Sequence, residues 1–292
     1  MNDYLLSLLL GIIEGLTEFL PVSSTAHLRI CEALLNISLS DPYWKMYSIV
    51  IQLGAILCLP IYFWPRIVSL LRSFPRGEKG DRTFLTHPLT LVCIAFVVTA
   101  GPAWLLRKRI GANLESLLVI GLSLLIGGIV MWLVDARFGP VPPRGHYKTE
   151  HIEEMSMAQA IWIGFCQIFS AVFPGTSRSM STIAAGQVSG MSRASALEFS
   201  FFLSMPTMIV ATGYDLLKNL RAPAGETALG RMPATSHEWT VLAIGFVVSF
   251  IVALGVVAWF MKWVRTKGFT PFAIYRIIVG IAVLVWVWKG HP

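Results

Sequence analysis

Three stretches of this 292-residue sequence lack any charged side chain, and they constrain its fold more than any other feature. They cover residues 83–106, 116–134 and 239–261, which contain no Asp, Glu, Lys or Arg. A helix of roughly 18 or more apolar residues can cross about 30 Å of hydrocarbon. Only 13% of all residues are charged, whereas soluble domains carry about 25%. The sequence therefore predicts an all-α polytopic membrane protein.

Six segments are predicted to be transmembrane helices because they are apolar over a sufficient length. They cover residues 43–64, 88–106, 116–134, 196–217, 240–263 and 271–288. Three intervening segments are predicted to be loops because they gather Lys, Arg, Pro and Gly. These loops cover residues 65–87, 135–156 and 218–238.

Two further apolar stretches, residues 4–36 and 157–190, are interrupted midway by proline and small hydroxyl residues. Each is predicted to form two short helices with a break between them. Non-helical backbone at membrane depth is tolerated where it is buried in protein or lines a wet cavity. Both stretches are therefore predicted to be re-entrant helical hairpins, which return to the side from which they enter.

The two interrupted stretches also resemble each other at a separation of 153 residues. The aligned pairs are Gly11 with Gly164, Glu14 with Gln167, Thr17 with Ser170, Pro21 with Pro174 and Ser24 with Ser177. Three spans follow each hairpin, and an odd number of crossings turns the second unit upside down. The chain is predicted to be a single membrane domain, residues 1–292, with a first repeat over 1–153 and a second, inverted repeat over 154–292. Such an architecture places a binding site near the midplane, where the breaks meet.

The net charge of +7 is attributed to loop Lys and Arg side chains that face the lipid bilayer. Nucleic acid is not expected as a partner because no basic stripe with interleaved aromatic residues appears. Lys and Arg residues divide almost equally between the two predicted sides. The long loop 65–87 is predicted to be cytoplasmic, and the sequence leaves a homodimer open.

Glu14 and Glu18 lie in the first hairpin at a spacing that puts both on one helix face. An ionised carboxylate at membrane depth is costly and marks a functional site by default. Two carboxylates repel each other unless a cation lies between them or one is protonated. We therefore expect a divalent cation, Mg²⁺ or Ca²⁺, at Glu14 and Glu18; the alternative is a pair in an aqueous interface.

The segment PVSSTAH, residues 21–27, is predicted to end one helix and begin the next. Pro21 interrupts the helix, and Ser23, Ser24 and Thr25 suit the start of the returning helix, where free N–H groups can bind phosphate. Ser24 and His27 then share a face, as a nucleophile and its general base would. The alternatives are that the hydroxyls only cap the helix and that His27 is a packed core residue.

The segment PGTSRSMST, residues 174–182, is the corresponding break in the second hairpin. Ser177, Ser179 and Thr182 suit a helix start and are predicted to bind substrate. Arg178 carries a fixed charge that needs an anion, and its guanidinium group is a natural bidentate phosphate clamp. The alternative is an arginine that extends its charge to the membrane surface.

The two hairpins together predict phosphoryl chemistry on a lipid-linked substrate, because they combine carboxylates, a nucleophile, a base and a phosphate clamp. A secondary transporter or lipid flippase is the main alternative, since inverted repeats and broken helices are typical of that class. A non-catalytic lipid-binding partner of the cell-wall machinery is a third reading. Neither alternative requires Ser24 and His27 opposite Arg178.

The motifs EGLTEFLPVSSTAHL and FPGTSRSMST resemble the two signature motifs of the undecaprenyl-diphosphate phosphatase family, the membrane enzymes linked to bacitracin resistance. Three further blocks resemble the family in the expected order: VIQLGAIL, EFSFFLSMP and GFTPFAIYR. The resemblance implies an integral inner-membrane enzyme with inverted repeats and two re-entrant hairpins. It implies hydrolysis of undecaprenyl diphosphate to undecaprenyl phosphate on the outer face, which recycles the carrier lipid for peptidoglycan synthesis. It also implies a divalent-cation requirement.

The residues that match the family's functional positions are Glu14, Glu18, Ser24, His27, Ser177, Arg178 and Thr182. The family's chemistry is argued with either a serine or a histidine in the leading role, and we favour Ser24 as nucleophile and His27 as base. Two positions depart from the family pattern. Ala26 stands where glycine is usual, and Met180 replaces a small residue.

Overall fold

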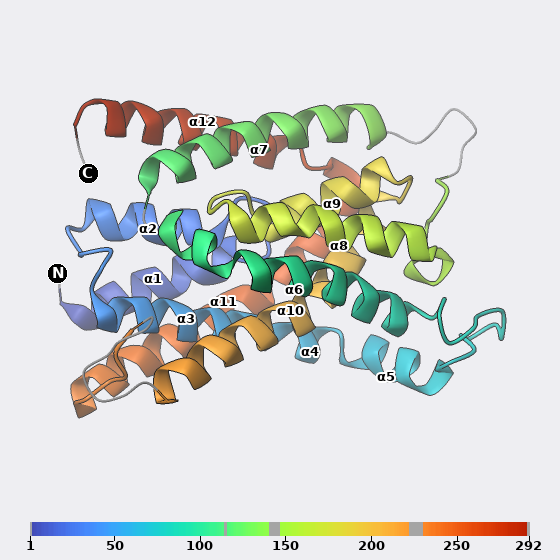
Figure 1. Ribbon diagram of the computed structural model, residues 1–292, viewed down its shortest axis with the longest axis horizontal. Helices are drawn as coiled ribbons and strands as arrows, with labels where there is room; N and C mark the ends of the chain where they lie inside the picture. The colour runs from blue at the N-terminus through green and yellow to red at the C-terminus, as the bar shows by residue number, and fades with distance from the viewer. Residues whose placement is uncertain (1, 114–115, 140–146, 222–229, 291–292) are drawn as a thin grey trace.

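The computed structural model describes residues 2–113, 116–139, 147–221 and 230–290 of the chain, with side chains omitted at 107–113, 220 and 221. Within these ranges the fold is helical, and the isolated bridge between Thr149 and Met191 is the only β pairing. The helices run side by side along the long axis of the molecule (Figure 1). Their bounds are α1 Asp3–Thr17, α2 Ser24–Leu34, α3 Pro42–Ile56, α4 Cys58–Tyr62, α5 Trp64–Ser73, α6 Pro88–Asn113, α7 Leu117–Phe138, η1 Ile152–Glu154, α8 Met157–Val172, α9 Arg178–Val188, α10 Arg193–Arg221, α11 Ser236–Lys267 and α12 Thr270–Trp288.

Six helical segments of the described residues are long and apolar enough to cross a membrane, as predicted. They cover Pro42–Tyr62, Pro88–Leu106, Leu117–Phe138, Arg193–Asn219, Ser236–Lys267 and Thr270–Trp288. Large apolar side chains cover their outer faces, including Leu105 at 74% exposure and Val97 at 65%. Exposed apolar surface of this extent on long helices indicates contact with lipid. The chain is therefore a multi-pass membrane protein.

The first span is divided into α3 and α4, which the sequence analysis did not predict. Helix α3 ends at Ile56 and α4 begins at Cys58. Pro60 has no N–H, so the carbonyl of Ile56 lacks its usual helical partner. The predicted loop 65–87 also begins with a helix, α5, which continues directly from this span.

Helix α7 continues past residue 134, where the sequence analysis placed the end of the third span. The charge of Asp135 suggested a loop, but its side chain is buried and accepts hydrogen bonds from Arg193 Nε at 2.8 Å and Gln187 Nε2 at 3.1 Å. A buried carboxylate with such partners is compatible with a helix interior. Residues 140–146 of the predicted loop 135–156 and residues 222–229 of the predicted loop 218–238 lie outside the described residues.

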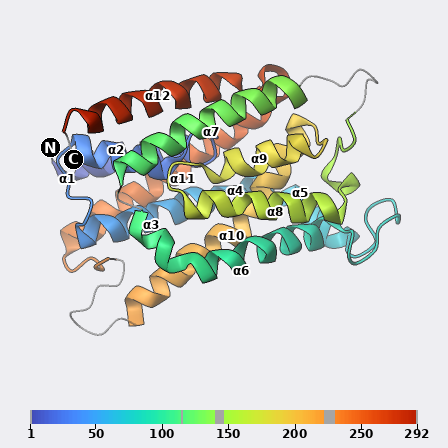
Figure 2. The ribbon, with the colours of Figure 1, turned by 45° about the horizontal axis from the view of Figure 1, so that its top comes forward.

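The two interrupted stretches each form a helix, a break and a second helix. We call α1–α2 hairpin 1, with break 1 at residues 18–23, and α8–α9 hairpin 2, with break 2 at residues 173–177. The returning helices begin in the same way, because Ser23 (φ 76°) and Ser177 (φ 71°) are both N-caps in a left-handed conformation. Hairpin 1 begins at the end of the molecule that holds the N-terminus, and hairpin 2 begins at the other end (Figures 1 and 2).

The helices of the two halves pack across each other rather than separately. Helix α1 packs on α11, α8 packs on α6, and α7 packs on α12. Glycines allow the first two approaches: a Cβ at Gly11 would lie 2.9 Å from the carbonyl oxygen of Gly245, and one at Gly164 would lie 2.5 Å from that of Ala95. Small residues at such crossings are the usual means by which membrane helices approach closely. This exchange brings the two breaks together in the interior.

Candidate active site

Glu18 connects the two hairpins. One carboxylate oxygen accepts a hydrogen bond from Ser24 Oγ at 2.5 Å, and the other accepts one from Arg178 Nη2 at 2.9 Å. Glu18 is 7% exposed, so this ion pair is largely shielded from solvent. Breaking a buried pair by removing one partner costs about 3–5 kcal/mol because the remaining charge is uncompensated. The predicted residues of the two distant segments therefore meet at one carboxylate.

Ser24 and Arg178 occupy equivalent positions, because each is the first residue of its returning helix. The sequence alignment paired Ser24 with Ser177, but the backbone pairs Ser23 with Ser177 and Ser24 with Arg178. The separation is thus 154 residues at the helix starts, one more than at the two prolines. Between its proline and the start of its returning helix, break 2 is therefore one residue longer than break 1. The backbone turns at Gly175, whose φ of 92° suits glycine.

Glu14 lies one turn before Glu18, and the bond from Glu18 N to Glu14 O at 2.9 Å confirms their predicted helical spacing. Its side chain is wholly buried, and neither carboxylate oxygen has a hydrogen-bond partner among the described residues. Arg178 Nη1 is likewise buried without a partner. Unsatisfied buried charges are rare and call for a ligand or an ion. The site thus has an unused acceptor for a cation and an unused donor for an anion.

A divalent cation could bind Glu14 without displacing another contact, but at Glu18 it would compete with Ser24 and Arg178. Glu14 offers two free oxygens, whereas both oxygens of Glu18 are already bonded. In the described part of the chain, no group of three or more His, Cys, Asp or Glu side chains is placed to hold a metal. Mg²⁺ is commonly held by one or two carboxylates together with substrate phosphates. The donor set suits a cation that arrives with a phosphorylated substrate rather than a closed structural site.

His27 lies on α2 beside the site, but its ring bonds elsewhere than to Ser24. Nδ1 lies 2.7 Å from the carbonyl oxygen of Ser23, which can only accept, so Nδ1 carries the proton in the neutral ring. Nε2 then accepts from the hydroxyl of Tyr275 at 2.8 Å, and the two rings stack. The predicted pairing of Ser24 with His27 is absent here, because the serine proton points to Glu18.

The remaining hydroxyls divide between capping and cross-linking. Ser23 accepts from the N–H of Ala26 and Ser177 from that of Met180, as predicted for N-caps. Ser179 Oγ donates to the carbonyl of Leu20, which links hairpin 2 to break 1. Thr182 is buried and bonds to Ser200 Oγ at 2.6 Å and to backbone carbonyls. Thr25 is part-buried next to Ser24.

Two residues of α12 belong to this region and were not predicted as site residues. Tyr275 orients His27, and the wholly buried Arg276 bonds to the backbone of both breaks. Both lie in the block GFTPFAIYR, which the sequence analysis used only as a family resemblance. An arginine inside the otherwise uncharged segment 271–288 was a signal that could have identified it.

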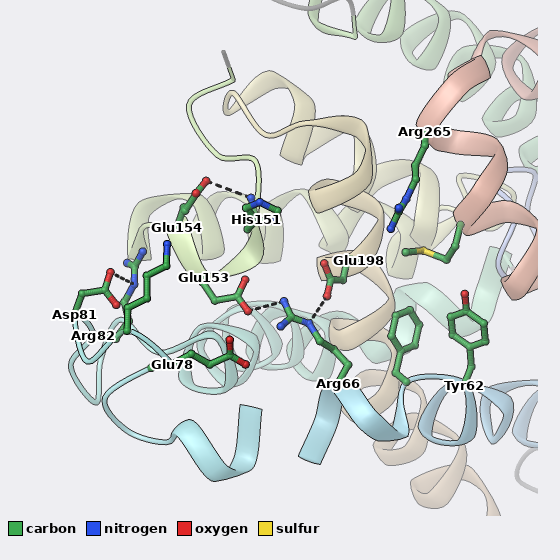
Figure 3. Close-up of a pocket in the computed structure, with 14 residues that line it drawn as sticks. Tyr62, Arg66, Glu78, Asp81, Arg82, His151, Glu153, Glu154, Glu198 and Arg265 are labelled. Carbon is green, nitrogen blue, oxygen red and sulfur yellow. Dashed lines mark hydrogen bonds and ion pairs between the residues drawn. The ribbon is translucent and has the colours of Figure 1, made fainter. Parts of the chain in front are cut away.

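A charged cavity of about 610 Å³ lies near the N-terminal end of α10, between the 65–87 segment and η1 (Figure 3). Arg66 lies across it and bonds to Glu153 at 2.5 Å and to Glu198 at 2.8 Å. Burial alone would lower the pKa of Arg66, but these two carboxylates raise it. None of the predicted site residues lines this cavity. Its charges largely neutralise one another, so it does not offer the excess positive charge that binds a diphosphate.

Comparisons with known proteins match nearly the whole length of the chain. The family model described as "Bacitracin resistance protein BacA" matches residues 7–282. An undecaprenyl-diphosphatase of Koribacter versatilis is 67% identical over 290 residues, which cover 99% of this chain and all of that protein. Proteins of the same name from Caldanaerobacter subterraneus and Rhizobium etli are 39% and 40% identical, over 94% and 99% of this chain and 93% and 98% of theirs.

Proposed function

We propose a function for this chain from the premise that it belongs to the BacA family of bacitracin resistance proteins. It is a membrane phosphatase that hydrolyses undecaprenyl diphosphate to undecaprenyl phosphate and inorganic phosphate, and so recycles the lipid carrier for cell-wall synthesis. The observation that carries the proposal is the meeting of Ser24 and Arg178 at Glu18. A transporter does not need a nucleophile, an acceptor for its proton and a phosphate clamp within one hydrogen-bonded group.

The architecture is proposed to be an inverted repeat with two re-entrant hairpins. Three observations support this: the hairpins begin at opposite ends of the molecule, they share the left-handed serine cap, and each packs on the second span of the other half. Helices α2 and α9 then direct the N–H groups of their first turns toward the interior. A helix N-terminus in that place favours a phosphate group.

Ser24 is proposed to attack the terminal phosphorus of the diphosphate. A bond forms between Ser24 Oγ and phosphorus, the anhydride P–O bond breaks, and undecaprenyl phosphate leaves with the bonding electrons. The serine proton passes to Glu18 Oε2, which lies 2.5 Å away. The oxygen of a water molecule then bonds to the phosphorus and the P–Oγ bond breaks. Glu18 returns its proton to Ser24 Oγ, and inorganic phosphate departs with both protons of the water. Glu18 therefore replaces His27 as the base for Ser24, and His27 stays a second base beside it.

Arg178 is proposed to exchange part of its contact with Glu18 for the phosphate oxygens. Its free Nη1 gives it a second donor for this purpose, and removal of one preorganised donor that stabilises charge in a transition state costs about 10²–10³ in rate. Ser177, Ser179, Ser23 and Thr25 surround the same helix starts. Thr182 is assigned to packing against α10, because Ser200 and backbone carbonyls occupy its hydroxyl.

A divalent cation, Mg²⁺ or Ca²⁺, is proposed to bind Glu14 and, when Arg178 turns to substrate, Glu18. When bound it supplies positive charge that offsets the charge of the diphosphate. The free oxygens of Glu14 support this assignment. The enzyme is proposed to lie in the bacterial inner membrane with the site open to the outer face, which rests on the family and on a cytoplasmic 65–87 loop.

The test is release of inorganic phosphate from undecaprenyl diphosphate by the purified protein in detergent, with and without a chelator. We expect release that the chelator stops and that added Mg²⁺ or Ca²⁺ restores. Absence of release, combined with movement of the intact lipid between leaflets of a vesicle, would support the flippase alternative instead. Ser24→Ala should abolish release, whereas undiminished release by Ser24→Ala would overturn only the choice of nucleophile.

A further inference from the structure

Arg276 donates hydrogen bonds to the backbone of three separate segments. Nη1 donates to the carbonyl of Pro21 at 3.1 Å, and Nη2 donates to the carbonyls of Gly175 at 2.9 Å and Ser123 at 3.1 Å. Pro21 belongs to break 1, Gly175 to break 2 and Ser123 to α7. The side chain is 0% exposed. One guanidinium group from α12 therefore holds both breaks at once.

The two carbonyls in the breaks are equivalent positions. Pro21 precedes Ser24 by three residues, and Gly175 precedes Arg178 by three residues. Ser24 and Arg178 begin α2 and α9, and both bond to Glu18. Arg276 thus bonds to the backbone three residues before each of the two side chains that meet at Glu18.

The surrounding helices leave room for this side chain and no charge to neutralise it. A Cβ at Gly127 would lie 2.3 Å from Nη2 of Arg276, so the guanidinium occupies the space that any other side chain there would need. Among the described residues, Arg276 forms no ion pair with a carboxylate. A buried cation is costly unless its donors are satisfied; here carbonyl oxygens accept from both Nη groups, and only Nε has no partner among the described residues. Retention of this cation in the interior indicates a role that an apolar residue cannot fill.

The position is also unique to one half of the molecule. At the separation of 153 residues, the counterpart of Arg276 is Ser123, whose carbonyl is one of its three acceptors. A single arginine therefore lies where the two halves meet and serves both breaks. A planar guanidinium with five donors can reach three carbonyls at once, whereas a lysine is a single point of charge.

We propose that Arg276 is a positioning residue that sets the separation of the starts of α2 and α9, and so holds Ser24 and Arg178 in reach of the same phosphate. The inference rests on the proposed phosphatase function for its kinetic consequence but not for its structural one. Arg276 does not touch substrate, because it is buried behind the breaks. Loss of the clamp should lower kcat and leave KM little changed, since the lipid tail contacts remain.

The kinetic test displaces the guanidinium group in one variant, Gly127→Ala, and replaces it in another, Arg276→Lys. Gly127→Ala places a methyl group 2.3 Å from Nη2 of Arg276 and 2.9 Å from Cε of Met180. In Gly121→Ala, on the same helix and also facing α12, the atoms nearest to the new methyl group belong to Leu284 and Val283, at 3.0–3.2 Å. We expect Gly127→Ala and Arg276→Lys to lower kcat at least tenfold, with KM within about twofold, and Gly121→Ala to retain kcat. A misplacement of about 1 Å can cost on the order of 10²-fold in rate. Equal kcat for the two glycine variants, or a loss confined to KM, would overturn the proposal.

The structural test does not depend on catalysis. Cysteines replace Leu34 and Val188, which are 62% and 41% exposed at the ends of α2 and α9, in a chain whose Cys31, Cys58, Cys93 and Cys166 are changed to alanine. Spin labels on the two cysteines report the distance between the hairpins in double electron–electron resonance measurements. We expect Arg276→Met to broaden or shift the distance distribution and Arg231→Met, an arginine that bonds to Glu238 in the first turn of α11 instead, to leave it unchanged. An unchanged distribution in Arg276→Met would refute the proposal that Arg276 sets the separation of the two hairpins. This conclusion would hold even if the wild-type protein released no phosphate.

Discussion

Hairpin 1 and hairpin 2 share a backbone design and differ in chemistry. Both break near a proline, and both resume helix after a serine in a left-handed conformation. Hairpin 1 carries Glu14 and Glu18, whereas the aligned positions of hairpin 2 are Gln167 and Ala171. At the first helical position, Ser24 faces Arg178 across the site. The comparison shows two segments with the same backbone turn and different side chains, namely carboxylates in hairpin 1 and an arginine in hairpin 2.

The largest effect is expected from Glu18→Gln. The amide can accept from one neighbour only, and it turns an N–H₂ group toward either Ser24 or Arg178. Loss of a general base costs about 10²–10⁴ in rate, so phosphate release should fall at least 10³-fold. Adding Ala171→Glu should not restore it. A double variant that recovers activity would show that the two hairpins are chemically interchangeable.

The next effect is expected from Arg178→Lys in hairpin 2. A lysine keeps the charge but loses the planar pair of donors that can hold Glu18 and a phosphate oxygen together. Removal of one such contact typically costs about 10² or more in rate. Steady-state phosphate release measures the loss. Arg193→Lys is the matched control, because Arg193 also bonds to a buried carboxylate but lies away from the breaks.

A smaller effect is expected from Glu14→Gln, which tests the cation assignment. The amide retains one oxygen ligand and loses the charge, so half-maximal activity should require about tenfold more divalent cation. Titration of activity with Mg²⁺ and Ca²⁺ measures this. Gln167→Glu in hairpin 2 provides the control and should leave the metal dependence unchanged. An identical metal titration for Glu14→Gln and the wild type would exclude Glu14 as a ligand.

Tyr275→Phe should have a modest effect, since it removes one hydroxyl and keeps the stacked ring. The His27 ring loses its second hydrogen bond and gains rotational freedom, which should lower kcat by about threefold to tenfold for a net contribution of about 1 kcal/mol. Comparison of the pH–rate profiles of Tyr275→Phe and the wild type measures it. If the two pH–rate profiles coincide, His27 takes no part in the reaction.

The smallest effect is expected from Glu154→Gln, just before hairpin 2. The Glu154 carboxylate accepts from the N–H groups of Glu150 at 2.7 Å and His151 at 3.2 Å, and the first of these bonds chiefly lowers its pKa below the ordinary 4.5. A lowered folded-state pKa contributes stability above pH 4.5 that is lost as pH falls through the lowered pKa. Thermal unfolding should therefore differ slightly between variant and wild type at pH 7 and converge in acid. Activity at pH 7 should be unchanged.

The local parts of the fold and site were predictable from the sequence. The six spans follow from uninterrupted apolar length, and the helix starts at Ser24 and Arg178 follow from the serines before them. Two boundaries were predicted wrongly because single residues have effects that hydropathy does not show. Asp135 suggested a loop by its charge, but it lies inside α7 because Arg193 pairs with it. Pro60 divides a span that is continuous in hydropathy. The one-residue difference between the two breaks was also hidden, because aligned prolines do not reveal how the backbone turns.

The sequence by itself determined which helices are long and apolar enough to cross a membrane, where two other apolar stretches break, and which charged side chains lie at the breaks. These properties depend on hydropathy, proline and capping, which act over a few residues. Only the tertiary structure decided that Glu18 bonds to Arg178, that Tyr275 turns His27 away from Ser24, and that Arg276 holds both breaks. The partners in these contacts are separated by 101 to 255 residues in the chain. Such pairs depend on how the helices pack, because a buried polar group is shielded from water and bonds to whichever partner the packing places beside it.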